Sequence, residues 1–304
     1  MVDQYKAAYH LPDSIAISEE MALKHWQLEK ELTQKLLQSA PERRWETFEE
    51  CYTTLYAELP WLNLIRDSGS IPDLEMYYSD WLSVIGPPPK RVYEVGSGRG
   101  SFVKYLASLG YDCTGTEITR ERGNKFDSGT PGLNWGITDG VHLARFEKPG
   151  TYDVLISDQV IEHLHPDDLV EHFRGALAIL KTGGSYVFRT PHYCFGPSDV
   201  SRIFRCEKSK GMHLKEYTYA EITAAVKKAG FDEIGAIPSI PYRIREAIGV
   251  RTKPKPSSVY LKYLSIVEKV IKTIPYQPAR YSITFLLSGF LMFRADVFVS
   301  VTKN

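Results

Sequence analysis

A glycine-rich stretch from Glu94 to Gly100, with the sequence EVGSGRG, contains the residues whose types and spacing most clearly indicate a chemistry. Glycines between a strand and a helix let the backbone approach a ligand closely, and the amino end of the helix favours an anionic group. Dinucleotide-binding enzymes use the related pattern G-x-G-x-x-G, but here the third glycine comes one position earlier, at Gly100. Glu94 would repel a pyrophosphate and attract the ammonium group of an amino-acid cofactor. The spacing therefore favours S-adenosylmethionine over NAD.

Two further acidic residues follow the next predicted strands. Glu117 ends the second strand, where its carboxylate is placed to bind both hydroxyls of a ribose, a feature that S-adenosylmethionine and NAD share. Asp139, in the sequence TDG at 138–140, is placed to accept a hydrogen bond from an adenine amino group. An ordinary surface-turn aspartate is the alternative interpretation of Asp139.

These residues need a sheet whose strands all end at one edge. From Arg91 onward, predicted strands alternate with predicted helices, which is typical of a doubly wound α/β domain with a parallel sheet. The predicted strands are 92–95, 113–117, 133–138, 152–157, 185–189, 231–237 and 295–301. Gly110, Gly183-Gly184 and Gly230 are predicted to end helices, and Thr218 with Glu221 forms a capping box. Ligands of such folds bind at the carboxyl ends of the strands.

The first 89 residues are predicted to form a helical cap, and residues 90–304 the main domain. Ser18 is a predicted helix cap, Pro41 a predicted first residue of a second helix, and the glycine-proline run at 86–89 a predicted boundary. Four of the five tryptophans lie in this segment: Trp26, Trp45, Trp61 and Trp81. They either pack the cap onto the main domain or line a substrate pocket.

A basic helical insertion, about 239–282, precedes the last predicted strand. Its apolar residues from Tyr260 to Ile274 recur at helical spacing and form a stripe. Two interpretations remain open. The stripe packs onto the domain while the lysines face water, or the segment contacts an anionic ligand or a membrane surface.

Composition excludes several classes of protein. Lysine plus arginine and aspartate plus glutamate are equal at 37 each, so no global positive field indicates a nucleic acid partner. The four cysteines are scattered without a C-x-x-C pair, and no clustered Asp/Asn pattern occurs, so we predict no metal ion and no disulfide framework. The first residues, Met1 to Lys6, lack the apolar h-region of a secretory signal, so we expect none. The apolar run 285–293 is far shorter than the ~20 residues that cross a bilayer. We expect a soluble cytoplasmic protein.

Residues from about 90 to 230 resemble the class I S-adenosylmethionine-dependent methyltransferases of the ubiquinone/menaquinone-biosynthesis type, which include many small-molecule methyltransferases. The resemblance rests on the order of five blocks: EVGSGRG at 94–100, Glu117, YDVLISDQVIEHL at 152–164, LKTGG at 180–184 and FRTPH at 188–192. Two positions depart from the family pattern. Gln159 stands where many relatives have an acidic residue, and His192 where many have asparagine.

The resemblance implies a Rossmann-like, seven-stranded sheet whose last strand is antiparallel, and S-adenosylmethionine as cofactor. The predicted cofactor site combines the positions derived above with those that the resemblance adds around them: Glu94, Gly96, Ser97, Gly98, Gly100, Glu117, Ile118, Asp139, Gly140, Ser157, Asp158 and Gln159.

We predict methyl transfer to a small-molecule acceptor, most simply to an oxygen of a sugar-like or lipid-like molecule of secondary metabolism. A hydroxyl acceptor needs a base, and His163, His192 and His213 all follow predicted strands on the ligand side of the sheet. The loop 191–217, with Tyr193, Arg202, Phe204, Arg205 and Lys215, is predicted to form part of the acceptor pocket. The alternatives are a non-catalytic nucleoside-binding scaffold and an NAD-dependent dehydrogenase.

Overall fold

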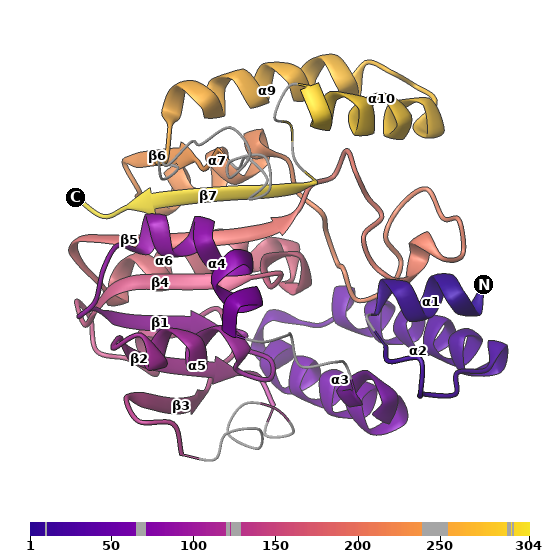
Figure 1. Cartoon of the computed structure of the whole chain (residues 1–304), viewed down its shortest axis with the longest axis horizontal. Helices are drawn as coiled ribbons and strands as arrows, with labels where there is room; N and C mark the ends of the chain where they lie inside the picture. The colour runs from indigo at the N-terminus through magenta and orange to yellow at the C-terminus, as the bar shows by residue number, and fades with distance from the viewer. Residues whose placement is uncertain are drawn as a thin grey trace.

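The computed structural model describes residues 1–9, 11–64, 71–119, 122, 129–238, 255–290, 293 and 295–304. A seven-stranded sheet in the order β3-β2-β1-β4-β5-β7-β6 forms its centre (Figure 1). The strands are β1 (Arg91–Val95), β2 (Asp112–Glu117), β3 (Leu133–Ile137), β4 (Tyr152–Asp158), β5 (Leu180–Pro191), β6 (Glu233–Ala236) and β7 (Asp296–Thr302). The first five strands are parallel, and β7 lies antiparallel to both β5 and β6. The predicted Rossmann-like methyltransferase fold is confirmed.

Strand β5 is the clearest difference from the predicted elements. Helix α6 (Leu169–Ile179) ends before Gly183 and Gly184, which lie inside β5 instead of ending the helix. Tyr152 of β4 pairs with Leu180, but the next pair joins Val154 to Ser185, so the two glycines belong to an irregularity in the ladder. Gly183 has a φ of +76°, which a glycine adopts without strain and other residues rarely do.

Helices cover both faces of the sheet because successive side chains of a strand point to opposite sides. Helices α4 (Ile71–Ile85) and α5 (Ser101–Ser108) pack on one face, where Trp81 and Phe102 meet Val92 and Ile156. Helices α6 and α7 (Tyr219–Ala229) pack on the other face in a second core that contains Tyr93 and Leu155. The capping box at the start of α7 is present, as predicted.

The N-terminal segment divides into two parts. Helices α1 (Val2–Ala8), α2 (Glu19–Leu37) and α3 (Arg44–Glu58) build a core of their own beside the sheet (Figure 1). Helix α4 packs directly on the sheet, so within the predicted cap of residues 1–89 only the part before α4 stands apart. The hydroxyl of Ser18 accepts a hydrogen bond from the Met21 amide over 3.1 Å, which confirms the predicted cap. Pro41 begins a 3-10 turn, Pro41–Arg43, that leads directly into α3.

The predicted insertion contains helices α9 (Ser258–Lys272) and α10 (Gln277–Phe290), while its residues 239–254 lie outside the described residues. Leu264 and Ile271 of α9 are buried in the same core as α7, so most of the apolar stripe packs onto the domain. Ile266 and Val270 are the exceptions, each with 62% of its surface exposed. Across the part of the chain that the structure describes, no helix is both long and apolar enough to span a membrane.

Candidate functional site

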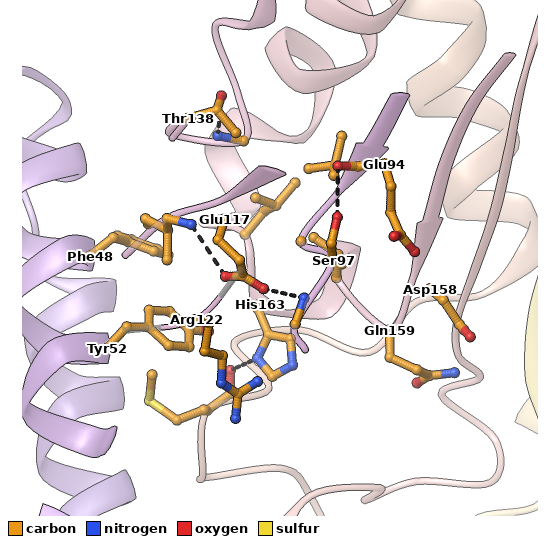
Figure 2. Close-up of a pocket in the computed structure, with 18 of the residues that line it drawn as sticks. Phe48, Tyr52, Glu94, Ser97, Glu117, Arg122, Thr138, Asp158, Gln159 and His163 are labelled. Atoms are coloured by element: carbon orange, nitrogen blue, oxygen red, sulfur yellow. Dashed lines mark hydrogen bonds between the residues drawn. The ribbon is translucent and has the colours of Figure 1, made fainter. Parts of the chain in front are cut away.

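A cavity of about 430 Å³ lies at the carboxyl ends of β1, β2 and β4. The sheet and its loops form one wall, and α3 forms the wall opposite (Figure 2). Ten of the twelve predicted cofactor residues line this cavity: Glu94, Gly96, Ser97, Gly98, Glu117, Ile118, Asp139, Gly140, Asp158 and Gln159. Gly100 and Ser157 do not line it.

The glycine-rich turn is tied to the end of β2 by hydrogen bonds. The Gly98 amide donates to the Glu117 carboxylate (Figure 2), and the Thr116 amide donates to the Ser97 hydroxyl over 3.0 Å. Gly98 has a φ of +57° and borders the cavity, so a side chain there would be strained and would project toward a ligand. The turn therefore presents backbone to the cavity and fixes the direction of Glu117.

Three carboxylates make the cofactor end of the cavity acidic. Burial raises the pKa of Glu94 to about 8, and the nearby charges of Asp158 and Glu117 raise it further. Burial also raises the pKa of Glu117, although Arg122 and the Gly98 amide oppose the shift. Asp158 accepts two hydrogen bonds from Arg189, over 2.7 and 2.6 Å. Such a pocket favours a cationic ligand and opposes a pyrophosphate.

Two of the predicted cofactor residues have structural roles instead. A Cβ atom on Gly100 would approach the Trp135 ring to 2.5 Å, so this glycine permits packing between the turn and β3. The Ser157 hydroxyl is fully buried and lies 2.7 Å from the Tyr186 hydroxyl, inside the core. Its position at the end of β4 is right, but its side chain points to the face of the sheet that α6 covers.

Asp139 lines the cavity and also holds its own turn together. One of its carboxylate oxygens accepts hydrogen bonds from the amides of Val141 and His142, over 2.8 and 2.7 Å. The second oxygen lies 2.6 Å from Nδ1 of His142. The turn interpretation thus accounts for its contacts, while its place at the cavity keeps the adenine contact as a prediction.

The wall of the cavity that α3 forms is aromatic. Phe48, Tyr52 and Tyr56 of α3 face the sheet edge, and the Arg122 guanidinium lies 4.0 Å from the centre of the Tyr56 ring. The sequence analysis did not predict this wall, because it considered the four tryptophans of the N-terminal segment as the aromatic candidates for a pocket. All four of those pack elsewhere: Trp26 on Phe204, Trp45 on Phe146, Trp61 against Tyr5 and Trp81 in the sheet core. The helical spacing of Phe48, Tyr52 and Tyr56 was the available signal.

The loop 191–217 contributes less to the cavity than predicted. Of its described residues, Met212 lines the cavity, whereas the five named in the sequence analysis do not. Phe204 stacks on Trp26, Lys215 pairs with Glu221 over 3.0 Å, and Arg202 donates to the Tyr281 hydroxyl. These side chains fix the loop against α2, α7 and α10.

The three predicted histidines lie in different surroundings. His163 lines the cavity, and His213 lies behind it with a ring-to-ring distance of 4.9 Å (Figure 2 shows His163). His192 lies apart from both. It is fully buried, and its Nε2 atom is 2.7 Å from Glu268 of α9, so it joins the insertion to the sheet and does not face the cavity.

Glu162 brings His163 and His213 into one cluster. Oε1 of Glu162 lies 3.9 Å from Nε2 of His163 and 4.0 Å from Nε2 of His213. Burial raises the pKa of Glu162 to about 7 and lowers that of His163 to about 3. Burial alone would also lower the pKa of His213, but the bond to Glu216 and the charge of Glu162 raise it to about 9. His163 is therefore neutral at pH 7 and a weak base.

Comparison with known proteins agrees with this geometry. Residues 73–234, a little over half of the chain, match a family model described as a methyltransferase domain. No curated protein matches the chain.

Several solved methyltransferase structures are similar to this chain at low sequence identity. Phosphoethanolamine N-methyltransferase 2 from Haemonchus contortus, in complex with phosphomonomethylethanolamine and S-adenosylhomocysteine, is 15% identical with a TM-score of 0.50, and the match covers 87% of this chain and 60% of that one. A SAM-dependent methyltransferase from Archaeoglobus fulgidus is 16% identical with a TM-score of 0.49, over 83% of this chain and 99% of that one. A SAM-dependent methyltransferase from Thermotoga maritima, a possible histamine N-methyltransferase by its description, is 17% identical with a TM-score of 0.46, over 86% and 99%.

Proposed function

The chain belongs to the methyltransferase-domain family and is an S-adenosylmethionine-dependent methyltransferase, and from that premise we propose that it methylates an oxygen of a small-molecule acceptor. One observation carries the proposal. The cavity that begins at Glu94 and Glu117 continues to an aromatic wall and to His163, which supports a site where cofactor and acceptor would lie side by side. Its size is in the range of small-ligand pockets, roughly 300–1,000 Å³.

The cofactor end suits the charge of S-adenosylmethionine. Its ammonium group would lie near Glu94 and its ribose near Glu117, whose direction is set by the Gly98 amide. The sulfonium adds a second positive charge, which three neighbouring carboxylates favour. NAD would place two negative phosphates in the same surroundings, so a dehydrogenase fits the pocket poorly.

The acceptor end suits a molecule with an apolar or aromatic face and one hydroxyl group. Tyr52 and Tyr56 provide flat surfaces for packing, and His163, which belongs to the Glu162–His163–His213 cluster, lines the same cavity. Close alignment of the two reactants supplies much of the rate in such a reaction.

The reaction balances without a redox step. A lone pair of the acceptor oxygen forms a bond to the methyl carbon, and the bond from that carbon to sulfur breaks with its electrons retained by sulfur. The products are the methyl ether and S-adenosylhomocysteine. The hydroxyl proton passes to the Glu162–His163–His213 cluster, in which Glu162, with a pKa of about 7, is a stronger base than His163.

Calorimetry and turnover test the proposal together. We expect S-adenosylmethionine and S-adenosylhomocysteine to bind and NAD not to bind, and Gly98→Val to abolish cofactor binding. Incubation with matched phenols, alcohols and amines should release S-adenosylhomocysteine and give a methyl ether by mass spectrometry. Binding of NAD alone would overturn the assignment of the pocket, and methylation of amines only would overturn the oxygen acceptor.

A matched pair of variants on α3 tests the acceptor wall. Tyr52→Ala should raise the KM for the acceptor about tenfold or more, because one buried aromatic surface is lost, with the Kd of S-adenosylmethionine unchanged. Trp45→Ala on the same helix should leave both constants unchanged, since Trp45 packs on Phe146 outside the cavity. Equal acceptor KM values for the two variants would place the acceptor elsewhere.

A further inference from the structure

Glu162, His163 and His213 gather three atoms that commonly bind metal ions. One ligand atom from each of the three residues lies within 4.8 Å of the other two, and Oε1 of Glu162 lies 3.9 Å from Nε2 of His163 and 4.0 Å from Nε2 of His213. Metal bonds of about 2.0–2.2 Å to such atoms place them roughly 3–3.5 Å apart around one ion. Small inward movements of the three side chains would therefore complete a coordination site.

The opposite ring nitrogens are already bound, which fixes the orientation of both imidazoles. Nδ1 of His163 lies 2.8 Å from the carbonyl oxygen of Met212, so it donates its proton there and leaves the lone pair on Nε2. Nδ1 of His213 lies 3.1 Å from a carboxylate oxygen of Glu216. A carbonyl or carboxylate behind the ring is the usual arrangement of a metal-binding histidine, because it fixes the tautomer and raises the basicity of the other nitrogen.

Glu162 provides an independent observation. Its Oε2 atom accepts a hydrogen bond from the Thr190 hydroxyl over 2.9 Å. Its Oε1 atom is fully buried and has no hydrogen-bond partner among the described residues. A buried carboxylate oxygen without a hydrogen bond is costly and calls for a partner, and the Nε2 atoms of His163 and His213 lie 3.9 and 4.0 Å from it.

The segments that hold the three side chains are anchored on both sides. Glu162 and His163 follow β4 directly, in the turn Ile161–His163. The amide of Met212 donates to Glu29 of α2 over 3.2 Å, which fixes the loop just before His213. A site on supported segments loses little entropy when an ion binds.

We propose that Glu162, His163 and His213 bind a divalent transition-metal ion at the acceptor end of the cavity. Two imidazoles and one carboxylate suit zinc, manganese, iron(II) or cobalt better than magnesium or calcium, which prefer oxygen ligands. This differs from the sequence analysis, which predicted no metal because it considered cysteine pairs and clustered aspartates. His213 lies 50 residues after His163 in the sequence, so only the fold brings it close to Glu162 and His163.

The role of the ion rests on the proposed function. Since the side chain of His163 borders the cavity with 29% of its surface exposed, the open coordination positions would face the acceptor. An acceptor hydroxyl bound there would ionise more readily, and its proton would pass to water instead of to the cluster. The ion would also hold the oxygen in line with the methyl group.

Cobalt provides a direct probe that needs no acceptor. Full-length protein treated with a chelator and dialysed should bind one Co²⁺ per chain, with visible absorption bands of a low-symmetry site, and should bind Mg²⁺ much more weakly. Glu162→Gln and His213→Gln should each weaken Co²⁺ binding about 100-fold or more. His142→Ala, which removes a half-exposed histidine outside the cluster, should bind Co²⁺ as the wild type does.

The outcomes separate the two proposals. Unchanged Co²⁺ binding in Glu162→Gln and His213→Gln, with native circular dichroism, would overturn the metal site, and so would the absence of one-to-one binding in the wild type. Stoichiometric Co²⁺ binding that both variants lose would support the site even if no hydroxyl acceptor were methylated. Failure of methylation alone would count against the proposed function.

Discussion

Glu94 lies buried near the end of β1, and we expect its protonation state to change with pH and with cofactor binding. Its pKa is raised to about 8 in the folded protein, against an ordinary value near 4.5, so at pH 7 the ligand-free protein holds a proton that the unfolded chain releases. The contribution of Glu94 to stability is therefore present at low pH and decreases as the pH rises from about 4.5 to about 8. Binding of an ammonium group requires the carboxylate and should expel that proton.

We predict that S-adenosylmethionine binding at pH 7 releases a proton and tightens as the pH approaches 8. Calorimetry in phosphate and in Tris, whose ionisation enthalpies differ, measures the release directly. Glu94→Gln should remove it and weaken binding, whereas Glu75→Gln, an exposed residue of α4, should retain it. Identical binding enthalpies of the wild type in the two buffers would show that Glu94 does not pair with the cofactor.

Glu117 gives a second prediction at the scale of single residues. Glu117→Ala should raise the Kd of S-adenosylmethionine about 10- to 100-fold, because charge-assisted hydrogen bonds to the ribose, each worth ~1.5–3 kcal/mol, are lost. The free energy of unfolding without cofactor should change less, since the variant also removes a buried charge. Glu49→Ala, an exposed change on α3, is the matched control. An unchanged Kd for Glu117→Ala would mean that the ribose binds elsewhere.

At the scale of elements, the capping box at the start of α7 allows the contribution of one helix cap to the free energy of unfolding to be measured. The Thr218 hydroxyl accepts from the Glu221 amide over 3.3 Å, and the Glu221 carboxylate accepts in turn from the Thr218 amide over 3.0 Å. We predict that Thr218→Ala lowers the free energy of unfolding by about 1 kcal/mol, measured by urea denaturation, with kcat unchanged. Thr223→Ala in the same helix should be close to neutral, because its hydroxyl bonds to a carbonyl that the helix already uses. Equal losses in both variants would contradict a specific role for the cap.

Comparing the elements with their predicted ranges shows which features of the fold the sequence could predict. The periodic strands, the capping box and the glycine turn are local features, and the structure contains them close to their predicted ends. Gly183-Gly184 was interpreted as a helix end because glycine is common there, but its role depends on how β5 pairs with β4, which is not a local property. Likewise, Ser157 and Asp158 are neighbours in sequence, yet only Asp158 faces the cavity, because side chains alternate along a strand.

The sequence could not show which of the three histidines lie near the cavity, because that depends on how distant segments come together in the fold. The fold brings His163 and His213 together, although they are distant in sequence. His192 instead pairs with Glu268 of α9, 76 residues further along the chain. All three follow strands, so their order along the chain did not distinguish them. The aromatic wall from α3 was outside the family resemblance, and the acceptor side of the pocket therefore had to come from the structure.

At the scale of the whole molecule, Glu29 joins the N-terminal helices to the catalytic sheet. It accepts from the Met212 amide over 3.2 Å and lies 2.7 Å from Nε2 of His25, and only 6% of its surface is exposed. Thr33, one turn further along α2, donates to the carbonyl oxygen of Gly211 over 2.5 Å. Helix α2 thus fixes the loop residues just before His213. The N-terminal helices and the ends of the strands together line the cavity.

We predict that Glu29→Ala loosens this connection across the whole molecule. It leaves the buried Met212 amide and one nitrogen of His25 without partners, at a cost of about 1–3 kcal/mol in the free energy of unfolding. Hydrogen exchange should accelerate in α1, α2 and at Met212, while the core strands β1 and β4 stay protected. Glu31→Ala, an exposed change on the same helix, should leave both measurements unchanged. If Glu29→Ala exchanges at the wild-type rate in α2 and at Met212, the cap is held to the sheet by its apolar core alone, and Glu29 serves only to border the cavity.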